Sequence, residues 1–123
     1  MSVCNILLVD DHADVREVTA LLLRDCGHSV IETPSGSAAL AVLDIDPTIE
    51  LLMVDFAMPE MSGSEVLQRA RTKRPGIRAV FITGYADYAE LSEEFTDEIV
   101  LKKPFTTDQL ALAVRKAMGE SGG

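Results

Sequence analysis

Residues 6–11 have the sequence ILLVDD, in which four consecutive apolar residues run directly into two aspartates. Two further segments, LLMV at 51–54 and AVFI at 79–82, show the same uninterrupted apolar pattern. Consecutive apolar residues are typical of parallel strands that are covered on both faces, because a strand with one solvated face alternates instead. These segments therefore predict three central strands of a parallel sheet.

Segments with helical periodicity separate the predicted strands. The strands are expected at Asn5–Val9, Ser29–Glu32, Glu50–Val54, Arg78–Ile82 and Ile99–Leu101. The second is short and alternating, which suits an edge strand. Five strand–helix units predict an α/β fold, a doubly wound five-stranded parallel sheet with helices on both faces. The common strand order for such a sheet is 2-1-3-4-5, with a ligand-binding crevice between the first and third strands.

Apolar spacing and local start and stop signals predict the helices. The first helix is marked by an apolar stripe that consists of Val15, Val18, Leu22 and Cys26. Gly27 follows this stripe and can adopt the left-handed backbone conformation that ends a helix. The capping box Thr106-x-x-Gln109 opens the last helix. The inner faces of the second, third and last helices are expected at Ala39, Leu40 and Leu43; Val66, Leu67 and Ala70; and Leu110, Ala113, Val114 and Ala117. A further helix is expected within 86–98, where six acids accompany a weak apolar face.

Composition limits the classes of protein to which the chain can belong. Its 123 residues, 47% hydrophobic and 25% charged, predict one globular domain over 1–118, with 119–123 as a flexible tail or the start of a linker. The net charge of −9 argues against nucleic-acid binding. No apolar run approaches a membrane span and no signal peptide is visible, so we expect a cytoplasmic protein. Cys4 and Cys26 lack C-x-x-C spacing and are expected to be free thiols.

Acidic residues follow two predicted strands that the strand order makes neighbours. Asp10 and Asp11 follow the first strand, and Asp55 follows the third. Converging carboxylates repel one another unless a cation lies among them. Oxygen ligands favour a hard ion, Mg²⁺ or alternatively Mn²⁺. His12 is adjacent in sequence, but one histidine does not define a transition-metal site, and we expect a surface residue that starts the first helix.

Two more polar groups follow the fourth and fifth predicted strands. Thr83 follows the fourth strand, and Lys103 follows the fifth. A hydroxyl, an ammonium and a divalent cation together can neutralise the oxygens of a phosphoryl group. A carboxylate acceptor would then form an aspartyl phosphate, and Asp55 is the central candidate. Each residue alone has an ordinary explanation as a helix cap, turn residue or solvated lysine, but their combination favours phosphoryl chemistry.

Four motifs make the chain similar to the receiver (response-regulator) domain of bacterial two-component systems over residues 5–118. They are ILLVDD at 6–11, LLMVDFAMPEMSG at 51–63, VFITG at 80–84 and LKKPF at 101–105. The resemblance implies a flavodoxin-like fold with strand order 2-1-3-4-5. It also implies a phosphoacceptor domain that works in a phosphorelay.

Carried over position by position, the resemblance makes Asp55 the phosphoacceptor. Mg²⁺ would be held by the carboxylates of Asp10, Asp11 and Asp55 and by the backbone carbonyl of Ala57. The hydroxyl of Thr83 would move towards the phosphoryl group once Asp55 carries it. The resemblance thus assigns roles only to residues at the carboxyl ends of the predicted strands and in the loop after Asp55.

The segments around these residues carry further expectations. Lys103 corresponds to the family lysine, and the Lys103–Pro104 peptide is expected to be cis. Lys102 points to the other side of an extended strand and is expected at the surface. Pro59 and Gly63 would shape the loop after Asp55, with Gly63 chosen for its backbone angles. The chain departs from the family where Val100 stands in place of a common aromatic residue and where Gly84-Tyr85 follows Thr83.

The resemblance also implies partners. A sensor histidine kinase or a histidine phosphotransfer protein would present phosphohistidine. The isolated chain would be no enzyme, although it would promote its own phosphorylation and dephosphorylation. A face formed by the helix within 86–98, strand Ile99–Leu101 and the last helix would carry the signal, and a homodimer through that face is a candidate. Both a stand-alone receiver and a domain of a hybrid histidine kinase are compatible with the sequence.

Three alternative functions fit the sequence less well. A haloacid dehalogenase-like aspartyl-phosphate phosphatase needs D-x-D after the first strand, where this chain has Asp10-Asp11-His12. Flavin binding needs a hydroxyl- and glycine-rich loop at the same place, where two acids stand. A degenerate receiver acting only as a dimerisation scaffold conflicts with the complete set of phosphorylation residues.

Overall fold

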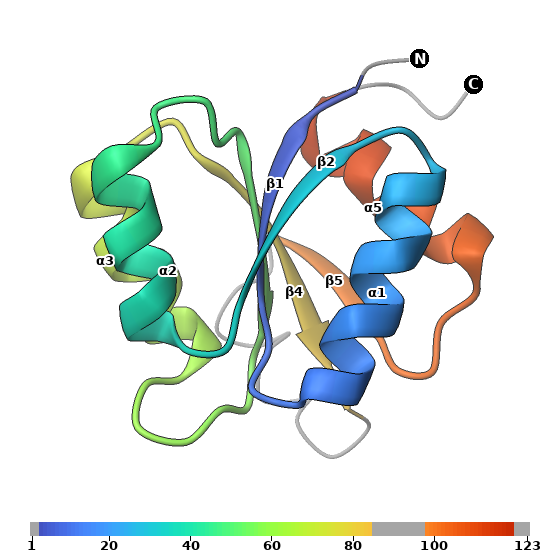
Figure 1. Ribbon diagram of the computed structural model, residues 1–123, viewed down its shortest axis with the longest axis horizontal. Helices are drawn as coiled ribbons and strands as arrows, with labels where there is room; N and C mark the ends of the chain where they lie inside the picture. The colour runs from blue at the N-terminus through green and yellow to red at the C-terminus, as the bar shows by residue number, and fades with distance from the viewer. Residues whose placement is uncertain (1–2, 85–97, 120–123) are drawn as a thin grey trace.

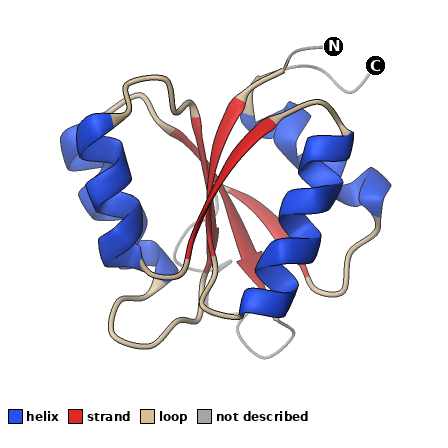
Figure 2. Ribbon diagram, in the orientation of Figure 1, coloured by secondary structure: helices blue, strands red, loops and turns tan. Residues whose placement is uncertain are grey.

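The computed structural model describes residues 3–84 and 98–119, which form a five-stranded parallel sheet between two layers of helices (Figures 1 and 2). The strands are β1 (Asn5–Val9), β2 (Ser29–Thr33), β3 (Leu51–Asp55), β4 (Arg78–Thr83) and β5 (Ile99–Lys102). Their order is β2-β1-β3-β4-β5, which confirms the predicted topology and places β2 at an edge. The predicted strand boundaries differ by about one residue, most usefully at β3, which extends through Asp55.

Helices cover both faces of this sheet. They are α1 (Ala13–Asp25), α2 (Gly36–Ile45), α3 (Gly63–Lys73) and α5 (Thr107–Ala117). In Figure 2, α2 and α3 lie on one side of the sheet and α1 and α5 on the other. The capping box of Thr106 and Gln109 is present at the start of α5, and Gly27 follows α1 with a φ of 94°. The helix predicted within 86–98 falls almost entirely on residues outside the described ranges.

The uninterrupted apolar runs supply both layers of the core. Leu7 and Val9 of β1 belong to the hydrophobic cluster beneath α2 and α3. Ile6 and Leu8 belong to the cluster beneath α1 and α5. Successive strand residues point to opposite faces, so a strand buried on both sides needs an apolar residue at every position. This periodicity explains why ILLV predicts a central strand.

The apolar stripe predicted for α1 is buried only in part: Leu22 packs against the cluster beneath α1 and α5, whereas two of its valines are exposed. The buried residues of this helix are Thr19, Ala20 and Leu23. Val15 is 38% exposed and Val18 is 57% exposed. Thr19 can be buried because its hydroxyl donates a 2.8 Å hydrogen bond to the carbonyl of Val15 within the same helix. The two valines are left on an open surface near the end of β5.

The structure also bears on the predictions for the two cysteines, for Val100 and for membrane spans. Cys4 and Cys26 form no disulfide, as expected, and the first is buried. Val100 is partly buried and packs against the cluster beneath α2 and α3. In residues 3–84 and 98–119, no helix is long and apolar enough to cross a membrane.

Candidate functional site

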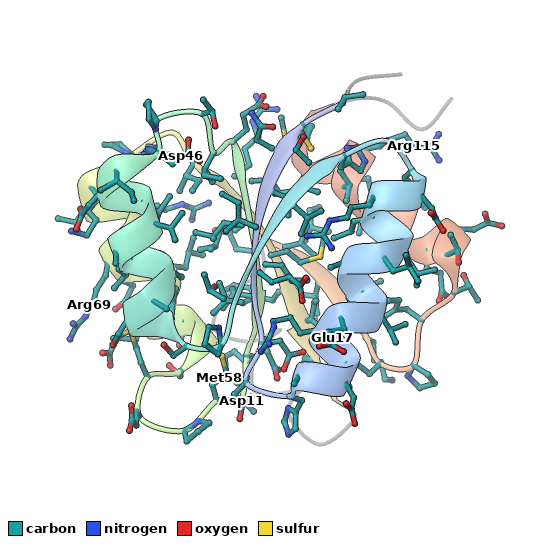
Figure 3. The ribbon with its side chains drawn as sticks, viewed as in Figure 1. Asp11, Glu17, Asp46, Met58, Arg69 and Arg115 are labelled. Atoms are coloured by element: carbon teal, nitrogen blue, oxygen red, sulfur yellow. The ribbon has the colours of Figure 1, made fainter. Side chains whose placement is uncertain are left out.

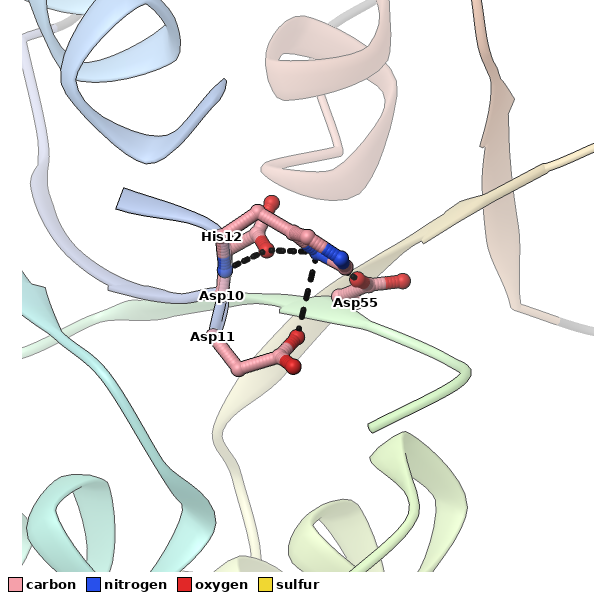
Figure 4. A group of neighbouring side chains, drawn as sticks. All are labelled: Asp10, Asp11, His12 and Asp55. Atoms are coloured by element: carbon pink, nitrogen blue, oxygen red, sulfur yellow. Dashed lines mark hydrogen bonds and ion pairs between the residues drawn. The ribbon is translucent and has the colours of Figure 1, made fainter. Parts of the chain in front are cut away.

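The pairing of β1 with β3 brings the predicted acidic residues together. Val9 is in register with Val54, so Asp10 and Asp55 follow on adjacent strands at one edge of the sheet. Both are buried, at 1% and 3% exposure, while the Asp11 side chain is 26% exposed. One ligand atom from each of these aspartates and from His12 lies within 4.8 Å of the others (Figure 4). The converging carboxylates predicted from the sequence are therefore present.

The turn from β1 into α1 fixes the orientation of Asp10. Its Oδ1 accepts a 2.9 Å hydrogen bond from the backbone N–H of His12. Its backbone carbonyl accepts a 2.9 Å hydrogen bond from Nη1 of Arg16, and its backbone N–H donates to the carbonyl of Thr33 at 3.2 Å. Neighbouring strand and helix thus hold both the peptide and the side chain of Asp10.

Lys103 reaches the acidic cluster from the end of β5. Its Nζ lies 3.6 Å from Oδ2 of Asp55 and 3.9 Å from Oδ2 of Asp10. Its backbone N–H donates a 2.8 Å hydrogen bond to the carbonyl of Thr83, and this bond holds the end of β5 next to the end of β4. Lys102 is exposed, and the Lys103–Pro104 peptide is cis, both as expected.

Thr83 lies beside this cluster at the end of β4. The residue is fully buried, and its hydroxyl donates a 3.2 Å hydrogen bond to the carbonyl of Gly84. Asp55 is in register with Ile82, and the N–H of Phe56 donates to the Ile82 carbonyl at 2.8 Å. Thr83 is therefore one residue beyond the partner of Asp55 on the neighbouring strand.

The loop after Asp55 is closed by a close backbone approach. Ala57 is exposed, and its N–H donates to Oδ1 of Asp55 at 3.4 Å. A Cβ atom on Gly63 would lie 2.5 Å from the carbonyl oxygen of Asp55 and 2.8 Å from Cα of Phe56. The reason predicted for Gly63 was wrong: the residue is needed for space, and the positive φ of this loop, 67°, belongs to Glu60.

The electrostatic environment distinguishes Asp55 from an ordinary carboxylate. The pKa of Asp55 is raised from 3.8 to about 6. Burial is the main cause, Lys103 acts in the opposite direction, and the neighbouring Asp10 adds to the increase. Among the described residues, the buried Oδ1 of Asp11 has no hydrogen-bond partner. A buried oxygen that accepts no hydrogen bond and three converging carboxylates fit a divalent cation with a preference for oxygen ligands.

Two residues at the site were not identified from the sequence. His12 starts α1 as its N-cap residue and its side chain is 63% exposed, as expected for a surface residue. Its ring nevertheless faces the cluster, with Nδ1 near all three carboxylates (Figure 4). Arg16 supports the cluster through the carbonyl of Asp10. A basic residue in the first turn after an acidic pair is the sequence signal that identifies such a contact.

Comparisons with known proteins agree with this geometry. The family model described as "Response regulator receiver domain" matches residues 6–115. The response regulator receiver protein CpdR of Brucella abortus is 35% identical over 115 residues, which are 92% of this chain and 95% of CpdR. The sensor kinase CckA of the same organism is 33% identical over 116 residues, again 92% of this chain but 12% of the kinase.

A solved structure supports the same relationship. The crystal structure of a response regulator receiver protein from Sinorhizobium medicae is 31% identical, with a TM-score of 0.83, and the match covers 96% of each chain. The phosphatase and flavin-binding alternatives are set aside, because the matched family is neither. The fold, the acidic cluster and the family match together show that the chain belongs to the response regulator receiver domain family of two-component systems.

Proposed function

We propose that Asp55 accepts a phosphoryl group from a phosphohistidine and that this chain transmits the resulting change by contact with other proteins. The observation that carries the proposal is the position of Asp55, buried at the end of β3 between the acidic pair and Lys103. A pKa of about 6 leaves most of this carboxylate ionised at neutral pH, so it can act as a nucleophile.

The chemistry of the transfer follows from the groups around Asp55. A carboxylate oxygen of Asp55 attacks phosphorus, the phosphorus–nitrogen bond of the donor breaks, and the donor imidazole leaves with its electron pair and takes up a proton. The Lys103 ammonium, 3.6 Å from Oδ2, attracts the phosphoryl oxygens. The Thr83 hydroxyl can exchange its bond to the Gly84 carbonyl for one to a phosphoryl oxygen.

The acidic cluster is proposed to bind Mg²⁺, with Mn²⁺ as the alternative. Asp10, Asp11 and Asp55 would supply carboxylate oxygens, and Ala57 its backbone carbonyl. When bound, the ion supplies positive charge that offsets the charge on the phosphoryl oxygens. The buried Oδ1 of Asp11, which has no hydrogen-bond partner among the described residues, supports this assignment.

A groove beside Lys103 is the proposed docking place for the phosphodonor, a sensor histidine kinase or a histidine phosphotransfer protein. It is lined on one side by Val15 and Val18 of α1 and on the other by Pro104 and Phe105. Lys103 belongs both to this groove and to the acidic cluster. A partner seated here would bring its phosphohistidine to Asp55 while covering exposed apolar side chains.

The remaining expectations are part of the same proposal. We propose a cytoplasmic domain, extending over 1–118, that has no enzymatic activity towards other molecules and does not bind nucleic acid. Signal output and a homodimer are proposed for the face that includes β5 and α5. Whether the whole protein is a single receiver or a hybrid histidine kinase would be settled by the size of the product in its own cells.

Labelling tests the proposal directly. The protein would be incubated with Mg²⁺ and acetyl phosphate, or with a phosphorylated kinase, and the adduct located by mass spectrometry. We expect an acid-stable, base-labile adduct on Asp55 that is absent from Asp55→Asn. Undiminished labelling of that variant would refute the assignment, and an unlabelled native protein would favour the dimerisation scaffold.

A further inference from the structure

We propose that His12 is a metal ligand of the acidic cluster and that it extends the preference of this site from Mg²⁺ towards ions that favour nitrogen. The inference rests on the proposed divalent-metal site. It adds a nitrogen donor to a ligand set that otherwise contains only oxygen. Imidazole suits Ni²⁺ and Zn²⁺, whereas carboxylates, carbonyls and water suit Mg²⁺.

The distances around the His12 ring carry the inference. Nδ1 lies 3.2 Å from Oδ1 of Asp11, 3.3 Å from Oδ1 of Asp10 and 3.9 Å from Oδ2 of Asp55. A hard ion in octahedral coordination with bonds of about 2.1 Å has adjacent ligand atoms about 3 Å apart. The two shorter separations therefore suit atoms that share one ion.

A single hydrogen bond from the ring does not satisfy all three carboxylates. One ring N–H can be donated at Nδ1, yet three carboxylates face that nitrogen (Figure 4). The geometry allows a hydrogen bond between the ring and Asp10. Oδ1 of Asp11 is buried and lacks a hydrogen-bond partner among the described residues, although Nδ1 is close to it. A metal ion can interact with all of these atoms at once.

The backbone holds His12 in this place. It is the N-cap residue of α1, with φ −92° and ψ 103°, and its N–H is bonded to Oδ1 of Asp10. Only the side-chain torsions are left to place the ring, and 63% of the side chain is exposed on the outer side of the cluster. A ligand in this position can bind an ion without displacing any residue of the core.

Calorimetric titration with Mg²⁺ and with Ni²⁺ tests the proposal. The main variant is His12→Asn, which keeps a side chain that is favourable at a helix N-cap, so α1 can still form. We expect its Kd for Ni²⁺ to rise about tenfold or more. Its Kd for Mg²⁺ should change by less than about threefold, because Mg²⁺ gains little from imidazole. The matched control is His28→Gln, which removes the other histidine of the chain, and it should leave both affinities unchanged.

A second measurement identifies the ligand atom. In the His28→Gln background a single imidazole remains, and its two ¹⁵N resonances can be followed during titration with diamagnetic Zn²⁺. We expect the Nδ1 resonance of His12 to move strongly and the Nε2 resonance to move little. Movement of Nε2 alone, or no movement at all when the site is filled, would overturn the assignment.

The outcomes separate this inference from the proposed function. If the native protein binds Mg²⁺ but His12→Asn changes both Kd values by the same factor, the metal site stands and the role of His12 is wrong. Tighter Mg²⁺ binding in His12→Asn with Ni²⁺ unchanged would show that the ring competes with the ion. If neither ion binds the native protein, or if Asp55→Asn binds both normally, the proposed metal site itself is refuted.

Discussion

The guanidinium of Arg16 donates a 2.9 Å hydrogen bond to the backbone carbonyl of Asp10, so a residue of α1 fixes the peptide between the two aspartates of the acidic pair. Nε of Arg16 lies 3.4 Å from Oε1 of Glu32, which holds the guanidinium against the edge strand β2. The Arg16 side chain is only 17% exposed. The carboxylates of the pair are thus oriented by a support that extends from α1 to β2.

Arg16→Gln should weaken metal binding although Arg16 touches no carboxylate of the cluster. We expect the Kd for Mg²⁺ to rise about tenfold, and the free energy of unfolding to fall by about 1–2 kcal/mol because a buried carbonyl loses its donor. Calorimetry and urea denaturation measure the two effects. Arg24→Gln is the control, since Arg24 pairs with the same Glu32 but donates to the carbonyl of Val30. Equal loss of Mg²⁺ affinity in both variants would contradict the positioning role.

The raised pKa of Asp55 predicts how stability depends on pH. Between the ordinary value of 3.8 and the folded value of about 6, the folded chain binds more protons than the unfolded chain. The free energy of unfolding therefore decreases as pH rises through this window. Above pH 6 the full stability cost of ionising the buried Asp55 has been reached. In metal-free buffer at pH 8, Asp55→Asn should raise the free energy of unfolding by about 3 kcal/mol, and the difference should vanish near pH 4.

A surface aspartate provides the control for that measurement. Asp44 is 55% exposed in an ion pair with Lys73, so Asp44→Asn should change stability by less than about 1 kcal/mol at either pH. Thermal or urea unfolding at the two pH values is sufficient. An Asp55→Asn variant no more stable than the native protein at pH 8 would show that burial does not penalise the Asp55 carboxylate.

Gly63→Ala should be strongly destabilising. The added methyl group would meet backbone atoms of Asp55 and Phe56 at 2.5 and 2.8 Å, and backbone in a buried strand cannot move aside. We expect a loss of about 3 kcal/mol in the free energy of unfolding. Gly76→Ala is the matched control, because no atom lies within 4 Å of its added Cβ. That variant should change stability by less than about 1 kcal/mol.

The docking groove predicts a selective effect on phosphotransfer. Val18→Lys places a charge on the groove beside Lys103 and should slow transfer from a phosphorylated histidine partner about tenfold or more, since a well-packed contact is worth at least about 1.4 kcal/mol. Phosphorylation by acetyl phosphate should be unchanged, because Asp55 is untouched. Leu21→Lys is the control: Leu21 is 59% exposed on the same helix and does not line the groove. Equal slowing by both variants would indicate a different docking place.

The sheet and most of the site were predictable for one physical reason. Parallel strands buried on both faces carry unbroken apolar runs, and their carboxyl ends meet at one edge. Residues that directly follow such runs, as Asp10, Asp55 and Thr83 do, must therefore lie close together. The strand order alone is enough to bring these residues together.

The parts that could not be predicted depend on three-dimensional contacts. Thr19 is buried because its hydroxyl is satisfied within α1, and a periodicity argument counts it as polar. The position of the His12 ring depends on side-chain torsions, which adjacency in sequence does not determine. The need for glycine at position 63 arises from the backbone of a strand eight residues earlier in the chain.

The two ends of the described fold lie away from Asp55, the proposed phosphoacceptor. Asn5 opens β1 beside Glu50, and Gly119 after α5 lies against Arg78 at the start of β4. Figure 3 shows Asp11 and Met58 at one end of the molecule and Asp46 and Arg115 at the other. Additional polypeptide joined at either terminus would leave from the pole opposite the reactive edge. Gene fusion could therefore append such a unit to a large kinase, or leave it almost alone, without obstructing the edge at which the proposed phosphodonor would approach Asp55.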